Sequence, residues 1–233
     1  MTLKNLDNFS KNIKGKLRFD YCLKNRTWLN IGGNAKIFFV PETLSELRDF
    51  LFKIKKDHNN LFVMGAGSNL LISDKTKNRI FIKLGNNFNK LSLTKDNVVI
   101  AGCSILDKNV SDFACENHLS GLEFLSCIPG TIGGGIKMNS GCFGTEFKDV
   151  LLSVQVMDFN GKVYTIKSKD INFDYRKTDL SKNLIFLSAS FRTDKKNRSI
   201  IEENIHRLKE KKKNSQPLRV KTGGSTFKNP KNQ

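Results

Sequence analysis

The amino-acid sequence predicts an α+β fold, in which several short strands are combined with a few helices. Short apolar or β-branched runs, typical of strands, recur along the chain. They lie at 35–40, 61–64, 80–84, 98–101, 154–158, 163–166 and 184–187. Asn160-Gly161 separates two of these runs, and this dipeptide is the strongest short signal for a hairpin. Many strands with few helical patterns and no internal repeat favour an α+β protein over a doubly wound sheet.

Three helices are predicted from apolar residues spaced three or four positions apart. The first begins at Pro41, because proline suits the first position of a helix. Its apolar stripe consists of Leu44, Leu47, Leu51 and Ile54. The other two helices cover about 106–117 and about 199–213, and the last of them is strongly charged. Residues 1–25 show no clean periodicity, so we interpret 1–29 as an N-terminal arm.

The composition of the 233-residue chain is that of a globular protein with one or two cores. No apolar run approaches the ~20 residues that span a bilayer, and the first residues lack the apolar region of a secretory signal. We therefore expect a cytoplasmic location. The five cysteines form no C-x-x-C pair and the three histidines share no ligand spacing. This pattern predicts reduced thiols and no metal site.

The formal net charge of +18 has two interpretations. A basic balance can indicate nucleic-acid binding. Here, however, lysine is spread over nearly every segment, which favours a lysine-rich surface over a nucleic-acid-binding face. The resulting positive field would still attract small anionic molecules that carry phosphates.

Glycine is concentrated in residues 121–144, at seven of 24 positions. Because glycine has no side chain, such a segment can bring its backbone N–H groups against a large, flat or anionic ligand. An irregular glycine-rich loop is the alternative. A second loop, Gly65-Ala66-Gly67-Ser68-Asn69, lacks the third glycine of a dinucleotide fingerprint. Since 70–72 looks like a return to strand, this loop is either an ordinary strand-to-strand turn or a phosphate-binding turn.

Four motifs then occur in a specific order: the loop at 65–74, the segment at 121–144, Asp174-Tyr175-Arg176, and the run at 224–230. Together they resemble the UDP-N-acetylenolpyruvoylglucosamine reductases, also called UDP-N-acetylmuramate dehydrogenases, of bacterial wall synthesis. The resemblance covers about residues 20–230. Four motifs in register are much more specific than any one of them.

The resemblance implies a two-part FAD-binding domain of the vanillyl-alcohol-oxidase (PCMH) type at 30–195. The start of a truncated substrate-binding domain would follow at 196–233. It also implies FAD as cofactor, NADPH as hydride donor, and reduction of an enolpyruvyl ether on UDP-N-acetylglucosamine to UDP-N-acetylmuramate. The expected partners are that UDP-sugar and NADPH, with no nucleic acid and no membrane, and the expected state is a monomer.

The resemblance further assigns residues to the reaction. Arg176 matches the catalytic arginine and Ser225 the serine proton donor, while Tyr175 and Asn229 match substrate-contacting positions. Hydride addition to an enolpyruvyl group places negative charge beside a carboxylate, which a guanidinium can stabilise before a proton is delivered. Without the motifs, Arg176 would be a surface ion pair and 223–226 a plain turn. The residues expected to bind FAD are Gly65, Ala66, Gly67, Ser68, Asn69, Pro129, Gly130, Gly133, Gly134, Asn139 and Gly141.

The sequence departs from this family at its end. Members usually continue with a segment whose glutamate works beside the arginine and the serine, whereas no acidic residue is present at 231–233. Two expectations remain open: an active reductase, or a catalytically impaired flavin-binding remnant without the glutamate segment.

Overall fold

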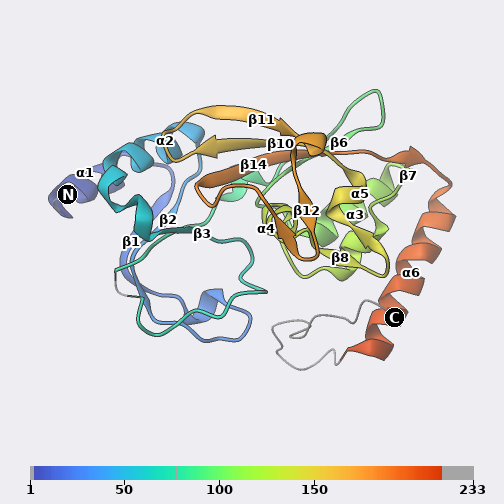
Figure 1. Ribbon diagram of the computed structural model, residues 1–233, viewed down its shortest axis with the longest axis horizontal. Helices are drawn as coiled ribbons and strands as arrows, with labels where there is room; N and C mark the ends of the chain where they lie inside the picture. Colours follow the sequence, from blue (N-terminus) through green and yellow to red (C-terminus); the bar gives the residue numbers. More distant parts are fainter. Residues whose placement is uncertain (1–2, 77, 217–233) are drawn as a thin grey trace.

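Two β-sheets form the framework of the molecule (Figure 1). The computed structural model describes residues 3–76 and 78–216. The first sheet has the order β1 (Lys16–Cys22), β2 (Asn34–Val40), β4 (Ile80–Ile82) and β3 (Leu61–Val63). β2, β4 and β3 run parallel to one another, and β1 is antiparallel to β2.

The second sheet has five strands and is antiparallel throughout. Its order is β11 (Val163–Lys167), β10 (Leu151–Asp158), β14 (Leu184–Phe191), β6 (Val99–Gly102) and β5 (Leu91–Leu93). The predicted hairpin at Asn160-Gly161 joins β10 to β11 and is confirmed. Mixed and antiparallel sheets with separate helices confirm the α+β class.

The five-stranded sheet lies between two apolar cores. Val156 and Phe186 face a core that also contains residues of α3 (Asp107–Glu116) and α4 (Ile132–Lys137). The next residue along each of these two strands faces the opposite core, which is shared with the first sheet and with α2 (Leu44–Lys53). Successive residues of a strand point to opposite faces, so one sheet serves both cores and joins the two halves.

The helix predicted from Pro41 begins three residues later, and its start is set by Thr43. The N–H of Glu46 donates to Thr43 Oγ1 at 3.1 Å, and the N–H of Thr43 donates to Glu46 Oε2 at 3.3 Å. This reciprocal capping box satisfies two backbone donors at the helix start, which proline at position 41 cannot do. The prediction was therefore correct in the helix but wrong in its first residue.

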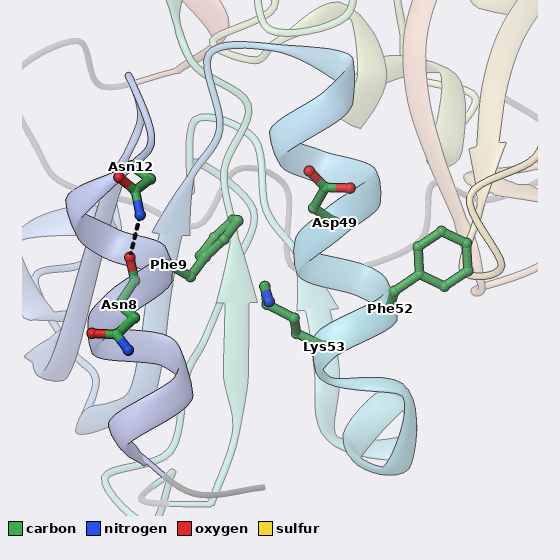
Figure 2. Close-up of a pocket in the computed structure, with 6 residues that line it drawn as sticks. All are labelled: Asn8, Phe9, Asn12, Asp49, Phe52 and Lys53. Carbon is green, nitrogen blue, oxygen red and sulfur yellow. Dashed lines mark hydrogen bonds between the residues drawn. The ribbon is translucent and has the colours of Figure 1, made fainter.

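The segment expected to be an N-terminal arm contains α1 (Leu3–Lys11) and β1, which the sequence did not predict. β1 is an edge strand whose residues alternate between half-buried and exposed, so it has no apolar run to recognise. Phe9 of α1 packs against Phe39 and Phe50, with ring centroids 5.9 and 6.2 Å apart. Figure 2 shows Phe9 pointing toward α2 across a shallow hollow, where the Lys53 ammonium lies 5.6 Å from its ring centroid. Part of the expected arm thus packs against the first sheet and α2.

The strand predicted at 70–72 does not form, and Leu71 is 76% exposed. β3 and β4 are parallel neighbours, so the chain must cross over between them instead of turning directly back. The irregular connection from Met64 to Arg79 makes this crossover and carries the first glycine loop along its course.

The remaining elements are short, apart from α6 (Arg198–Ser215), which covers the helix predicted at about 199–213. Ile201 and Ile205 of α6 pack against Cys115 of α3. The short strands are β7 (Leu119–Ser120), β8 (Gly141–Cys142), β9 (Thr145–Glu146), β12 (Phe173–Asp174), β13 (Lys177–Thr178) and β15 (Asp194–Lys195). The short helices are η1 (Lys24–Arg26), η2 (Lys55–Asn60), η3 (Asn86–Phe88), η4 (Glu123–Cys127), α5 (Phe147–Val150) and η5 (Ser168–Asp170).

All five cysteines are free thiols. Within the ranges 3–76 and 78–216, no helix has the length and apolar character needed to cross a membrane.

Candidate functional site

A cleft of about 1860 Å³ brings the two glycine-rich segments together. The two segments from which the expected FAD-binding residues were selected therefore lie along one cleft. Of the residues selected from the sequence, those that line the cleft are Gly65, Ala66, Gly67, Ser68, Asn69, Pro129, Gly130, Gly133, Gly134, Gly141, Tyr175 and Arg176.

The two segments touch at Gly65 and Thr131. A Cβ on residue 65 would overlap the hydroxyl oxygen of Thr131, so only glycine allows this approach. The loop is held in place by the Trp28 N–H, which donates to the Gly67 carbonyl at 3.0 Å. Gly67 has φ of +75°, a conformation that glycine adopts without strain. The backbones of the two glycine-rich segments therefore lie next to each other at the cleft.

Part of the central segment is helical, which neither the ligand-binding interpretation nor the alternative of an irregular loop predicted. α4 contains three successive glycines, an unfavourable composition for a helix in isolation. Gly135 packs so tightly on the ring of Phe147 that any side chain there would overlap it. Tertiary packing therefore outweighs the low helix propensity. It leaves Gly133 and Gly134 facing the cleft without side chains.

Arg176 is held by a set of oxygen acceptors at one wall of the cleft. Its Nη1 donates to the Asn139 carbonyl at 3.2 Å and to Glu146 Oε1 at 3.3 Å, and its Nη2 donates to the Gly141 carbonyl at 3.0 Å. Arg176 adopts φ of +55° between β12 and β13, and a left-handed conformation costs a non-glycine residue of order 1 kcal/mol or more. These bonds hold the guanidinium in the cleft despite the strained backbone.

Asn139 does not line the cleft, unlike the other residues selected for the cofactor. It is fully buried, and its side-chain amide donates to Glu146 Oε2 at 2.9 Å and to the Asp174 carbonyl at 3.1 Å. Its Oδ1 accepts from the Lys148 N–H at 3.1 Å. The geometry makes Asn139 a support for Arg176 and Glu146 and offers no position for direct cofactor contact.

The charges around the cleft are mainly positive. Its basic residues are Arg79, Lys83, Lys137, Lys148, Arg176, Lys182 and Lys212, against the acidic Asp107, Glu146 and Asp149. Burial lowers the pKa of Lys137 and of Lys83, and for Lys83 the neighbouring Arg26 lowers the pKa further. A site with this balance attracts anionic ligands such as diphosphates.

α6 reaches the cleft through Lys212, whose ammonium donates to the Cys127 carbonyl at 2.6 Å. Cys127 and Cys142 also line the cleft. Burial, together with the adjacent Cys127, raises the pKa of Cys142 to about 12, so this thiol is neutral at ordinary pH. No residue of the helix predicted at about 199–213 was assigned to the site, yet Lys212 of this helix lines the cleft.

Three buried polar side chains that sequence reasoning missed are Asp107, Ser111 and Thr131. Within the described part of the chain, the Thr131 and Ser111 hydroxyls and both carboxyl oxygens of Asp107 have no hydrogen-bond partner. Buried polar groups are normally satisfied, so the unpaired groups of Asp107 and Thr131, which line the cleft, are suited to bind a polar ligand there. Thr131 could have been suspected, since it immediately precedes the glycine triplet. Nothing in the sequence marks Asp107.

Two further sequence-based assignments, Ser225 and Asn229, lie outside the described residues. The cleft therefore contains Tyr175 and Arg176 of the predicted reaction residues. No cluster of His, Cys, Asp or Glu suited to a metal ion occurs among residues 3–76 and 78–216.

Comparison with known proteins places the described part of the chain among flavoproteins. A family model described as an FAD binding domain matches residues 35–167. The UDP-N-acetylenolpyruvoylglucosamine reductase of Pelagibacter ubique is 51% identical over 233 residues, which cover 100% of this chain and 77% of the relative. The reductase of the same name from Rickettsia conorii is 42% identical over 218 residues, covering 94% and 73%.

Solved structures agree with the sequence relatives. The UDP-N-acetylenolpyruvylglucosamine reductase of Thermus caldophilus matches with a TM-score of 0.79 at 29% identity, over 94% of this chain and 76% of that one. The Physcomitrella patens BBE-like 1 protein matches with a TM-score of 0.60 at 16% identity, over 82% and 44%. At that identity the second likeness shows the fold alone.

Proposed function

Because the chain belongs to the UDP-N-acetylenolpyruvoylglucosamine reductase family, we propose that it reduces UDP-N-acetylenolpyruvoylglucosamine to UDP-N-acetylmuramate, with FAD bound in the cleft and NADPH as hydride donor. Its enzyme class is that of the flavin-dependent oxidoreductases. The observation that carries the proposal is the single cleft in which two glycine-rich segments meet at Gly65 and Thr131, with Arg176 at its wall. Residues 30–195 would form the FAD-binding domain, and 196–233 would begin the substrate-binding domain.

In this proposal the residues of the chain bind and orient the two ligands. The backbone of residues 65–69 and the hydroxyl of Thr131 bind the diphosphate of the cofactor, aided by the basic residues of the cleft. Bound FAD supplies hydride transfer, which no side chain can perform.

Arg176 would bind the carboxylate of the enolpyruvyl group and stabilise the negative charge that develops beside it. The acceptors that hold its guanidinium fix its position before substrate binds, so little reorganisation is needed. Tyr175, whose ring centroid lies 5.0 Å from the Arg176 guanidinium, would contact the same substrate. Ser225 would deliver the proton, and Asn229 would contact the substrate.

Cofactor binding is tested by adding FAD to the purified chain and following the quenching of flavin fluorescence. We expect a yellow protein that releases FAD on denaturation. In Gly134→Leu the new Cβ would lie 3.6 Å from Thr131 Oγ1, an ordinary contact, so the fold tolerates the change while the side chain fills the cleft. This variant should lose FAD binding at unchanged thermal stability. Ser92→Leu, at an exposed position of β5 outside the cleft, is the matched control and should bind normally. A wild-type chain that takes up no FAD contradicts the proposal.

Turnover is tested separately, because an impaired flavin-binding remnant would pass the first assay. The measurement is NADPH oxidation that depends on the enolpyruvyl substrate. Substrate-dependent turnover supports the reductase, and FAD binding without it supports the remnant.

A further inference from the structure

A buried carboxyl group adjoins the cleft without a partner. Asp107 is the first residue of α3, is fully buried, and belongs to the cleft lining. Neither of its oxygens accepts or donates a hydrogen bond within residues 3–76 and 78–216. A carboxyl left in this state costs free energy, so the free protein keeps it there at a disadvantage.

The backbone around Asp107 fixes its position against the central glycine segment. The Asp107 N–H donates to the Gly130 carbonyl at 3.1 Å, and Leu106 forms an isolated bridge with Thr131. A Cβ on residue 130 would lie 2.7 Å from Asp107 Oδ2. The missing side chain at Gly130 therefore lets the carboxyl group approach the same stretch of backbone that presents the Thr131 hydroxyl to the other glycine loop.

The surroundings of Asp107 favour its neutral form. Burial raises the pKa of Asp107 well above the ordinary value of an aspartic acid. The titratable group that faces it is the buried thiol of Cys103, whose pKa is raised by burial and by Asp107 itself. A thiol offers no positive charge to stabilise a carboxylate. A neutral carboxylic acid, unlike a carboxylate, has an O–H to donate.

We infer that Asp107 is a cofactor-binding residue, which as a neutral acid donates a hydrogen bond to a phosphate oxygen of the bound dinucleotide, beside the hydroxyl of Thr131. This inference rests on the proposed function, since it takes FAD as the ligand of the cleft. A phosphate oxygen accepts the donor that the free protein leaves unused, whereas an ionised carboxylate would repel the diphosphate. FAD would then bind most tightly to protein that carries this proton.

The inference predicts a pH dependence of FAD affinity that belongs to one residue. As pH rises through the raised pKa of Asp107, the wild-type dissociation constant should increase, with a limiting slope of tenfold per pH unit once Asp107 ionises in the free protein. Asp107→Asn keeps a neutral donor of similar shape and should bind FAD as the wild type does at low pH, with a flat profile. Asp107→Leu should bind about tenfold more weakly even at low pH, as loss of a hydrogen bond to a charged group predicts.

Controls separate this inference from the function on which it rests. His58 also lines the cleft, so the readout is the difference between wild type and Asp107→Asn at each pH. Asp112→Asn changes an aspartate of the same helix that pairs with Lys108 on the exposed side, and it should follow the wild-type profile. Riboflavin, which has no phosphate, should show no Asp107-dependent slope.

If FAD affinity depended on pH identically in wild type and in Asp107→Asn, the inference would be overturned. The buried carboxyl group would then not contact the phosphate of FAD. An Asp107-dependent slope that persists with riboflavin would overturn the phosphate contact. Failure of the wild type to bind FAD at any pH would instead refute the proposed function.

Discussion

The substitution Gly135→Ala tests whether packing on one phenylalanine sets the position of the glycine helix. In an ordinary helix, replacing glycine by alanine stabilises by about 1 kcal/mol. Here the new Cβ would overlap two ring atoms of Phe147, a side chain that is fully buried and has no room to move. Overpacking a core costs about 1–3 kcal/mol, and the overlap with two atoms places this site in the upper half of that range.

The two effects predict a net loss of about 1–2 kcal/mol for Gly135→Ala. For a chain of this size that corresponds to a decrease in Tm of about 2–8 °C. Phe147→Leu removes the Cε and Cζ atoms that the new methyl group would meet. In that background the helix-propensity gain of about 1 kcal/mol remains alone, so Gly135→Ala should raise Tm by about 2–4 °C.

The assay is thermal unfolding of the four proteins of this cycle, followed by circular dichroism without added FAD, since a bound ligand would shift Tm by itself. The expected result is a change of sign between the two backgrounds, equivalent to a coupling energy of about 2–3 kcal/mol. If Gly135→Ala raised Tm equally in both backgrounds, the packing argument for α4 would be refuted.

Three further substitutions test the cleft and the framework. Gly65→Ala should force the buried Thr131 hydroxyl from its position, so FAD affinity should fall about tenfold. An unchanged affinity would show that the contact does not serve the cofactor. Glu146→Gln removes the carboxylate partner of Arg176. Because this ion pair is partly exposed, the free energy of unfolding should change by less than about 1 kcal/mol. Turnover should fall by about tenfold to a hundredfold, because the Arg176 guanidinium would be misoriented. Equal losses of stability and turnover would argue for a purely structural role. Thr43→Ala removes the N-cap of α2 and should lower the free energy of unfolding by about 1 kcal/mol. This loss corresponds to a decrease in Tm of about 2–4 °C. A Tm unchanged within error would contradict the capping argument.

The parts of the fold that could be predicted are those with local causes. The hairpin at Asn160-Gly161 formed because the turn dipeptide acts on its own neighbours. The apolar stripes that predicted α2 and α6 likewise lie within single helices. β1 was missed because an edge strand needs no apolar run. The predicted strand at Leu71 was wrong because the parallel pairing of β3 with β4, a non-local feature, requires a crossover there.

The candidate site divides in the same way. The two glycine-rich segments could be selected from the sequence by their chemistry, because residues without side chains allow close contact with a ligand. The Tyr175-Arg176 turn was selected only through the resemblance to the reductase family. Asn139 was selected through the same resemblance, but its hydrogen bonds make it a support for Arg176 and Glu146. The role of Asn139 depends on its hydrogen bonds to Glu146 and Asp174, which only the tertiary structure brings next to it.

The sequence by itself determined the fold class, several main strands and helices, and the family of this protein, since all of these follow from local patterns and ordered motifs. Only the tertiary structure decided that Gly65 meets Thr131, that Gly135 packs on Phe147, and that Asp107 is buried beside the cleft without a partner. The physical reason is that overlap, burial and hydrogen-bond satisfaction are properties of atoms brought together from distant parts of the chain. No spacing along the chain specifies which polar group will be left unpaired once the core has closed around it.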